Sequence, residues 1–290
     1  MKKILFVVNN LSGTVSQYNI KKCVEIFLDH EKYNSSLFYI DSETNPSEYI
    51  SLFDKNYDII VSVGGDGTLL EIGQNIIDKN ITLGIIPIGS GNGLATHLGY
   101  KPREIENAFK AINSEKIVPI DVATINGEYF FSNFGYGIDA LIAKDFKIKK
   151  KRSLLVYSTL TIKRILNIKP TFISYITDGK EYSAETYLFN VFNSNLFGYN
   201  VGLLPWASAF DGKLDLVYLR KASWWKFPFI TLCILLKKPQ WSSDLIFSEI
   251  TDITIKNPNK IEYQVDGDPK LTKSDIQINI LPSKLNVIVP

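Results

Sequence analysis

The feature that most constrains the fold of this 290-residue chain is a strand that runs directly into a glycine-rich loop and then into a helix. Residues 59–63 form a continuous β-rich apolar run, residues 64–68 read Gly-Gly-Asp-Gly-Thr, and apolar residues then recur with helical spacing from Leu69 to Ile77. A buried strand joined to a helix by a tight turn is the repeating unit of a parallel α/β sheet. The loop therefore predicts an α/β layer in this part of the chain.

The first 120 residues repeat this alternation of short β-rich runs and longer segments of helical period. Such alternation is typical of a Rossmann-like, mostly parallel sheet that is flanked by helices. We expect strands at residues 4–8, 37–40, 59–63 and 83–88, and helices after Tyr18, Pro46, Thr68 and Asn92.

Beyond Asp121 the pattern changes to apolar runs broken by turn residues, which indicates mainly antiparallel β structure. The dipeptides Asn126-Gly127, Asp178-Gly179 and Asp211-Gly212 lie between or beside such runs, as hairpin turns would. We expect strands at residues 129–134, 171–177, 186–192, 214–219, 250–255 and 276–280, and a last strand at 285–289. The expected domains are an α/β domain at 1–121, to which 282–290 returns, and a β-sandwich domain at 122–281.

Composition excludes several classes of function. The formal net charge is +2, from 32 basic and 30 acidic residues mixed along the chain, which argues against a nucleic-acid partner. Cys23 and Cys233 lie far apart, which fits neither a disulfide framework nor a metal cluster and favours a reducing cytoplasm. Neither His30 nor His97 has a nucleophile or a second metal ligand nearby in sequence, so the sequence does not support a hydrolase triad or a zinc site. The apolar stretch at 227–236 is too short to span a bilayer.

The loop at Gly64 has the properties of a phosphate-binding site. A strand–turn–helix junction offers unpaired backbone N–H groups and the positive end of a helix dipole, and glycines let a phosphate approach the backbone. The carboxylate of Asp66 would repel phosphate unless it binds magnesium or accepts a proton from an attacking group, and both uses belong to phosphoryl transfer. For an isolated Asp66-Gly67 pair, a plain turn that closes a βα unit would be the usual interpretation.

Two further junctions of the same kind support the phosphate site. Residues 87–93 (Pro-Ile-Gly-Ser-Gly-Asn-Gly) follow the next expected strand, and residues 9–14 (Asn-Asn-Leu-Ser-Gly-Thr) follow the first. The carboxyl ends of parallel strands lie at one edge of a sheet, where open α/β folds bind their ligands. We therefore expect the three loops to line one crevice.

These three loops resemble the nucleotide-binding motifs of the diacylglycerol kinase catalytic family, which includes bacterial lipid kinases and sphingosine kinases. The similarity continues through residues 131–140, 193–215 and 264–269, so nearly the whole chain is covered. The resemblance implies a transferase that moves the γ-phosphate of ATP to a lipid hydroxyl, with Mg²⁺, in phospholipid biosynthesis, and with ATP between the two domains. The implied ATP-binding residues are Asn9, Asn10, Leu11, Ser12, Gly13, Asp41, Gly64, Gly65, Asp66, Gly67, Thr68, Leu69, Leu70, Ser90 and Asn92.

The segment 205–215 is similar to the family segment that holds a structural magnesium. By that resemblance Asp211 is the carboxylate ligand, with the backbone carbonyls of Ser208 and Lys213 beside it. The family usually has two acidic residues before the glycine, and here Phe210 replaces the first, which puts metal affinity in question. A plain β-hairpin with an acidic turn is the alternative.

The segment 264–269 resembles the late Asp-Gly-Glu motif of the family, whose final acid is taken as the general base for the lipid hydroxyl. Asp268 occupies that place, although its side chain is one methylene shorter than glutamate. Asp66 is the competing base, because sphingosine kinases are thought to use the aspartate of the glycine loop. A solvated turn is the alternative for Asp268.

Three other segments bear on a lipid substrate. By the family resemblance Asp139 binds the lipid head group, and it could equally cap a helix that runs through Ile142. The basic run 147–152 is either a solvated face or a contact with anionic lipid heads. The aromatic and apolar segment 223–236, followed by two lysines, suits a helix packed on the β domain or an interfacial membrane contact.

The acceptor stays open between diacylglycerol and a sphingoid base. The loop 89–95 looks more like the sphingosine kinase form, whereas the compact second domain looks like that of bacterial diacylglycerol kinases. The alternatives are an NAD kinase-like enzyme, whose later glycine-rich motif is missing, and a non-catalytic lipid or nucleotide sensor, motivated by Phe210 and Asp268. The expected partners are ATP and a membrane lipid, with peripheral contact at the inner membrane face and a homo-oligomer left open.

Overall fold

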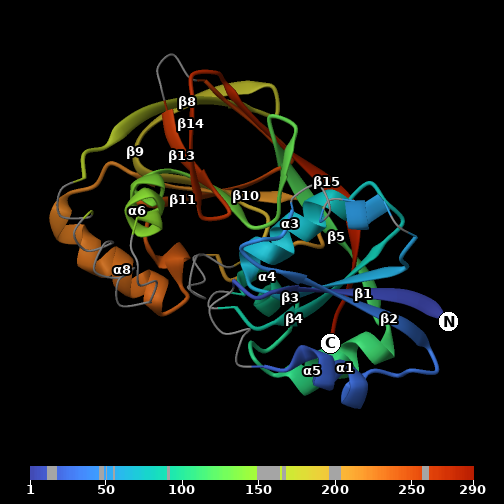
Figure 1. The fold of residues 1–290 in the computed structure, drawn as a ribbon. Helices are drawn as coiled ribbons and strands as arrows, with labels where there is room; N and C mark the ends of the chain where they lie inside the picture. The colour runs from blue at the N-terminus through green and yellow to red at the C-terminus, as the bar shows by residue number, and fades with distance from the viewer. Residues whose placement is uncertain are drawn as a thin grey trace. The chain divides into compact units, whose positions relative to one another are not determined.

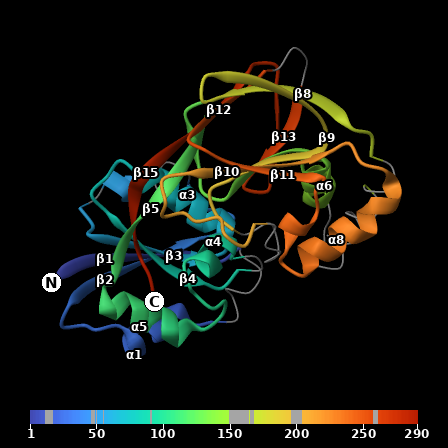
Figure 2. The same ribbon diagram turned by 180° about the vertical axis from the view of Figure 1, so that it is seen from behind.

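The structure is a computed structural model that describes residues 1–11, 18–45, 49, 51–54, 56–89, 92–148, 164, 168–195, 204–256 and 261–290. The chain forms two compact units, which are drawn from two sides in Figures 1 and 2. The first unit is Met1–Ile120 with Ser283–Pro290, and the second is Asp121–Pro282. Within the described part of the chain, no helix is long and apolar enough to cross a membrane.

The first unit contains a parallel sheet with the strand order β2-β1-β3-β4, and the end of β15 pairs with β4. These strands are β1 (Lys2–Asn9), β2 (Tyr33–Ile40), β3 (Ile59–Gly64), β4 (Thr82–Pro87) and β15 (Ile276–Ile288). Every residue of β3 is buried, as expected for a central strand that is covered on both faces.

Helices cover both faces of this sheet. They are α1 (Ile20–Phe27), α3 (Asp66–Ile76), α4 (Gly93–His97) and α5 (Ile105–Ser114), with a short 3-10 turn at Leu52–Asp54. Figures 1 and 2 show α1 and α5 side by side on one face and α3 on the other. Phe109 of α5 stacks on Phe6 of β1 with ring centroids 5.7 Å apart, and Phe27 of α1 packs on the same ring at 5.9 Å. These contacts fix α1 and α5 to the sheet.

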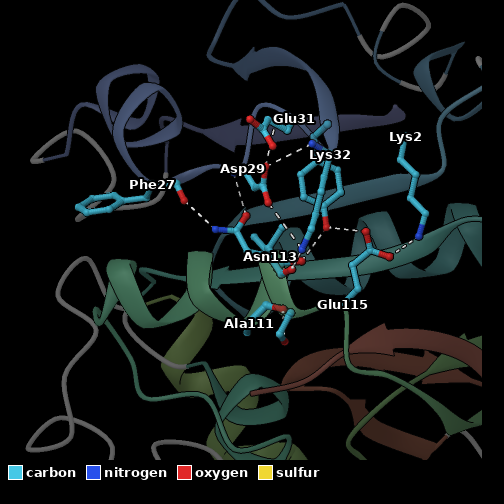
Figure 3. A network of polar contacts seen from close by, with 11 residues as sticks. Lys2, Phe27, Asp29, Glu31, Lys32, Ala111, Asn113 and Glu115 are labelled. Atoms are coloured by element: carbon cyan, nitrogen blue, oxygen red, sulfur yellow. Dashed lines mark hydrogen bonds and ion pairs between the residues drawn. The ribbon is translucent and has the colours of Figure 1, made fainter.

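A polar network ties α1 and α5 together at the amino end of β2 (Figure 3). The side chain of Asn113 donates to the carbonyl of Phe27 at 2.8 Å and accepts from the backbone N–H of Asp29 at 3.0 Å. Lys32 donates to the carbonyl of Asn113 at 2.9 Å. The amino edge of the sheet is thus closed by protein contacts, and the carboxyl edge is where the three glycine loops begin.

The second unit is a mainly antiparallel β-sandwich. Its strands are β5 (Ile117–Ile125), β6 (Glu128–Phe130), β7 (Asn133–Gly137), β8 (Thr171–Thr177), β9 (Lys180–Phe192), β10 (Leu214–Arg220), β11 (Leu245–Ile250), β12 (Asp252–Lys256), β13 (Ile261–Val265), β14 (Asp268–Thr272) and the first part of β15. They pair in the order β14-β13-β7-β9-β8-β12-β15, with β10 and β11 branching from β9. The sandwich interior is filled by buried side chains such as Phe134, Phe189 and Leu216.

Two helices pack on this unit. α6 (Ile138–Lys147) contacts β13 and β14, and α8 (Phe227–Leu235) is flanked by 3-10 turns at Trp224–Lys226 and Pro239–Trp241. Ile230 of α8 belongs to a second apolar cluster with Phe192, Val217 and Leu245.

Most expected elements are present, and the differences have local causes. The runs 276–280 and 285–289 belong to one continuous strand, β15. Because β15 pairs antiparallel with β12 and parallel with β4, the sheet as a whole is mixed and not purely parallel. The run 250–255 is divided at Thr251 between β11 and β12. The run 129–134 is interrupted at 131–132, where the backbone N–H groups bind the side chain of Asp266 and not a neighbouring strand.

The turn dipeptides behave differently from one another. Asn126-Gly127 and Asp178-Gly179 have positive φ at both positions and close the β5–β6 and β8–β9 hairpins, as predicted. Asp211-Gly212 instead precedes β10, whose partners β9 and β11 are not joined to it through this turn. The start of the helix expected after Pro46 lies outside the described residues.

Candidate active site

Three strand ends meet at the carboxyl edge of the parallel sheet. β1, β3 and β4 are adjacent and in register, with Val8 opposite Val63 and Gly64 opposite Pro87. Asn9, the last residue of β1, connects the first two loops because its Nδ2 donates to Oγ1 of Thr68 at 2.8 Å. The first two predicted phosphate loops are therefore brought together as the sequence suggested.

The second and third loops approach each other through glycine backbone. A Cβ on Gly89 would lie 2.2 Å from Cα of Gly65, a distance that no side chain tolerates. The N–H groups of Ile88 and Gly89 both donate to the carbonyl of Gly64, at 3.0 and 2.9 Å. Glycine at position 89 is thus required by packing of the two loops.

Gly67 has a different environment. A Cβ added there would meet no described residue within 4 Å, and the φ of Gly67 does not lie in the left-handed region. Neither packing nor backbone conformation requires a glycine at this position, which is the second residue of α3.

Asn92 closes the third loop. It adopts a left-handed conformation, with φ 65°, and is buried. Its Nδ2 donates to the carbonyl of Gly89 at 2.8 Å, and its Oδ1 accepts from the N–H of Gly89 at 3.1 Å. The side chain of Asn92 therefore holds its own loop in shape.

Asp66 is the first residue of α3. The residue keeps an exposed surface, but protein packed around its carboxyl group disfavours the charged form and raises its pKa. The backbone N–H groups of Gly93, Asn92 and Leu94 oppose that rise by stabilising the carboxylate. Asp66 thus links the start of α3 to the start of α4, across the second and third loops.

In the second unit, Asp139 is the centre of a buried polar cluster. Its Oδ2 accepts from Nδ2 of Asn190 at 2.7 Å and from Nε2 of Gln264 at 2.6 Å. Gln264 and Asn190 lie opposite Gly135 on neighbouring strands, and a Cβ on Gly135 would be 1.8 Å from Oδ2 of Asp139. The missing side chain of Gly135 therefore leaves the space that the carboxylate fills.

Burial raises the pKa of Asp139 to about 6, and the hydrogen bonds from Gln264 and Asn190 limit the rise. Asp139 does not cap α6, because Gly137 is the N-cap residue and no side chain accepts a capping hydrogen bond. The carboxylate points into the sheet face and not along the helix end. Oδ1 of Asn190 has no hydrogen-bond partner among the described residues, although it is buried.

The turn between β13 and β14 is a tight hairpin with positive φ at Asp266 and Gly267, 50° and 86°. The carboxylate of Asp266 accepts from the backbone N–H groups of Phe131, Ser132 and Asn133 at 2.9, 2.7 and 3.0 Å. Asp266 is therefore anchored to the β6–β7 connection, and only Asp268 fits the solvated alternative.

Asp268, the expected base, is the first residue of β14, and 63% of its side chain is exposed. Nζ of Lys147, at the end of α6, lies 3.1 Å from its Oδ1. A second ion pair joins Lys144 of α6 to Glu262 of β13 at 2.7 Å. Together with Asp139, these pairs fix α6 against the hairpin that carries Asp268.

The predicted metal residues lie in the loop before β10. Oδ1 of Asp211 accepts from the N–H of Lys213 at 3.1 Å, and Oγ of Ser208 accepts from the N–H of Phe210 at 3.3 Å. Phe210 itself is exposed. No group of three or more His, Cys, Asp or Glu side chains among the described residues could hold a metal. A cation here would depend on Asp211 and on backbone carbonyls.

Two neighbouring aspartates were not expected. Oδ2 of the buried Asp121 accepts from the N–H of Gly212 at 2.6 Å, which fixes the loop. Burial and the charge of Asp211 raise the pKa of Asp215 to about 6. Asp211 is thus the one of these carboxylates that the sequence singled out, and Asp121 and Asp215 are its acidic neighbours.

The remaining predicted residues are separate from these groups or not described. Oδ1 of Asp41 accepts from the N–H of Glu43 and the hydroxyl of Thr44, both at 3.0 Å, so Asp41 shapes a local turn after β2. Ser12, Gly13 and Ser90 lie outside the described residues, as does the basic run beyond Ile148. Sequence reasoning missed Gln264 and Asn190, whose one signal is an amide between two apolar neighbours in a strand.

Comparisons with known proteins agree with this architecture. The model of the diacylglycerol kinase catalytic domain matches residues 3–125, and that of the YegS C-terminal NAD kinase beta sandwich-like domain matches residues 132–289. A diacylglycerol kinase of Bacillus subtilis (strain 168) is 29% identical over 218 residues, which cover 74% of this chain and 72% of that protein. A probable lipid kinase YegS-like of Klebsiella pneumoniae (strain 342) is 25% identical, covering 81% of this chain and 79% of that protein.

Solved structures share the fold over the whole chain. A crystal structure of a diacylglycerol kinase from Bacillus anthracis str. Sterne matches with a TM-score of 0.73 at 21% identity, covering 100% of this chain and 97% of that one. A second crystal structure from the same organism matches with a TM-score of 0.80 at 23% identity, covering 100% and 95%. The chain therefore belongs to the diacylglycerol kinase catalytic family, with a C-terminal domain of the YegS type.

Proposed function

We propose that this protein is an ATP-dependent lipid kinase that transfers the γ-phosphate of ATP to a lipid hydroxyl. One observation carries the proposal: the ends of β1, β3 and β4, each followed in the sequence by a glycine-containing loop, lie side by side at the carboxyl edge of the parallel sheet. In the second of these loops, no described residue occupies the place that a side chain at Gly67 would take. A phosphate that approaches the first turn of α3 would account for that glycine, since packing does not. Family membership supports the same conclusion.

On the ATP side, the backbone N–H groups at the start of α3 bind the phosphates, and Asn9 and Thr68 hold the first two loops in register. Mg²⁺ bound with the ATP phosphates would neutralise their charge, and Asp66 is the residue that would hold it. A separate, structural Mg²⁺ would be held by Asp211 with the backbone carbonyls of Ser208 and Lys213. The Asp211 carboxylate and its neighbouring carbonyls are the oxygen ligands that such a cation prefers.

On the acceptor side, the carboxylate of Asp139 binds the head group and Asp268 is the general base. The lipid hydroxyl gives its proton to Asp268 while its oxygen bonds to the γ-phosphorus. The bond from that phosphorus to the β–γ bridging oxygen breaks, and ADP leaves with the bond's electron pair. The ion pair with Lys147 directs the Asp268 carboxylate before the acceptor arrives. Diacylglycerol and a sphingoid base are the candidate acceptors.

The test is to incubate the purified protein with γ-labelled ATP, Mg²⁺ and separate micelles of diacylglycerol, sphingosine and other hydroxyl lipids, with NAD as a further acceptor. We expect label in one lipid product and none in NAD. Label in NAD alone would indicate an NAD kinase-like enzyme. If no lipid is labelled while the protein binds ATP, the catalytic proposal is wrong and a sensor role follows.

A further inference from the structure

The surface around α8 is more apolar than the outside of a folded domain usually is. Seven large apolar side chains from Trp224 to Trp241 are exposed by 51% or more of their area, with Trp224 itself at 80%. The α8 patch, as we define it, consists of Trp224, Trp225, Phe229, Leu232, Leu235 and Trp241. Single exposed apolar residues are normal in soluble proteins, but a contiguous group of this kind marks an interaction site.

The patch exists because α8 is apolar on all sides, whereas only one side packs in the apolar cluster beneath it. Ile230 and Cys233 are buried, and Ile230 packs in the cluster with Val217 of β10. Phe229 and Leu232 are spaced by three residues and therefore share another face, which faces solvent. An all-apolar helix is normally enclosed by protein or lipid. On its outer face, α8 has no such cover from the residues that the structure describes.

The charges and aromatic residues around α8 indicate that its binding partner is a lipid bilayer. Residues 221–243 contain four lysines and no acidic residue. Lys221 and Lys226 form ion pairs with Glu185 and Asp244, whereas Lys237 and Lys238 form none with any described residue. Two unpaired cations next to an apolar face complement anionic lipid head groups.

Tryptophans lie at both ends of the helix, which is the arrangement of side chains that anchor at the boundary of a bilayer. Trp224 and Trp225 precede α8, and Trp241 follows it in the 3-10 turn Pro239–Trp241. The indole ring is apolar with one polar N–H, and it is enriched at the depth of the head groups. Nine residues are too few to span the hydrocarbon core, so the helix would lie in the interfacial plane.

We propose that the α8 patch docks this protein on the surface of an anionic lipid bilayer. The outer face of α8 enters the boundary between head groups and acyl chains, and Lys237 and Lys238 reach the lipid phosphates. The proposal does not rest on the kinase activity, because docking requires neither ATP nor an acceptor.

The test is co-sedimentation of the intact protein with phosphatidylcholine vesicles, with and without phosphatidylglycerol, at low and high salt. We expect binding to the anionic vesicles, weaker binding at high salt, and a blue shift of tryptophan emission on binding. The double variant Phe229→Ser/Leu232→Ser should bind about tenfold more weakly or worse. Lys237→Glu/Lys238→Glu should lose its preference for phosphatidylglycerol.

Phe172→Ser is the matched control, because Phe172 is 68% exposed on β8, outside the patch. It should bind vesicles like the wild type, and circular dichroism should show all variants folded. Equal vesicle binding by the wild type and the Phe229→Ser/Leu232→Ser variant would overturn the proposal. So would a wild-type dimer in sedimentation velocity that this variant dissociates, without vesicle binding, since the patch would then face a second copy of the chain.

Discussion

Gln264 donates a hydrogen bond of 2.6 Å from Nε2 to Oδ2 of the buried Asp139 carboxylate. The other end of the same amide, Oε1, accepts from the N–H of Gly267 at 2.7 Å. Gly267 directly precedes Asp268, so one side chain connects the buried carboxylate to the turn that carries the proposed base. Substitution at position 264 should therefore affect both groups at once.

Gln264→Leu removes both hydrogen bonds and leaves the N–H of Gly267 unpaired. We expect a loss of about 1–3 kcal/mol in the free energy of unfolding, as is usual for a buried polar group that loses its partner. We also expect a fall in kcat as well as a rise in KM for the lipid, because the turn before Asp268 loses its support. Urea unfolding and steady-state kinetics measure the two effects. The control is Gln277→Leu, at an exposed position of β15, which should change neither the free energy of unfolding nor the kinetics. Equal effects of the two substitutions would contradict the role of Gln264 in positioning the turn before Asp268.

Stability should depend on pH through Asp139. Its pKa is raised from 3.8 to about 6 in the folded protein, so the folded state keeps this proton over a range in which the unfolded chain has lost it. Wild-type stability should accordingly fall as the pH rises through that window, and the loss is complete above about pH 6. The side chain in Asp139→Asn has no carboxyl group, so it does not titrate in this pH range.

The free energy of unfolding of Asp139→Asn, relative to the wild type, should therefore rise between about pH 4 and pH 7. At about 1.4 kcal/mol per pKa unit the change is at most about 3 kcal/mol. Urea unfolding at a series of pH values measures it. Parallel pH profiles for the two proteins would show that Asp139 does not carry the raised pKa.

Two glycines of the phosphate loops should respond in opposite ways to alanine. Gly67→Ala adds a Cβ that meets none of the described residues and improves helix propensity in α3, so the free energy of unfolding should hold or rise by about 0.5–1 kcal/mol. ATP binding should nevertheless be lost, because the methyl group occupies the approach of the phosphates. Gln74→Ala, at an exposed position of the same helix, is the control and should bind ATP normally. Unchanged ATP affinity in Gly67→Ala would show that the phosphates do not bind at this turn.

Gly89→Ala should instead destabilise the fold, since its Cβ would lie 2.2 Å from Cα of Gly65. Overpacking against backbone costs about 1–3 kcal/mol or more. Thermal unfolding compares this variant with Gly67→Ala directly, and equal stability of the two would mean that the loops separate easily.

Asp66→Asn should abolish transfer of label to lipid while leaving stability within about 1 kcal/mol of the wild type, because the protein packed around the carboxyl group of Asp66 already disfavours its charge. The measurement is initial rate together with thermal unfolding. A fully active, folded Asp66→Asn protein would exclude Asp66 from the mechanism.

The parallel layer and the meeting of the phosphate loops were predictable because periodicity and glycine turns are local signals. The Asp139 cluster was only half predictable. Gln264, Asn190 and Gly135 become neighbours through antiparallel pairing of β13, β7 and β9, and no local pattern encodes that register. Asp139 was singled out by resemblance, whereas the amides that bind it are visible only when the strands are paired.

The ends of elements were the least predictable part. Residues 276–288 form one strand that pairs with strands of both units. In the first unit Val287 pairs with Leu83 of β4, and in the second unit residues 276–279 pair with β12. The apolar run in α8 was recognised, but its sequence alone could not tell which face is buried, since nearly every residue is apolar. That depends on Val217 and Leu245, which lie on other strands.

The most direct test of the central claim is transfer of labelled phosphate from γ-labelled ATP to diacylglycerol or sphingosine in mixed micelles, comparing the wild type with Asp268→Asn. The account predicts labelled lipid with the wild type and a loss of about 100-fold or more with Asp268→Asn, while ATP binding is retained in both. Absence of labelled lipid with the folded, ATP-binding wild type would contradict it.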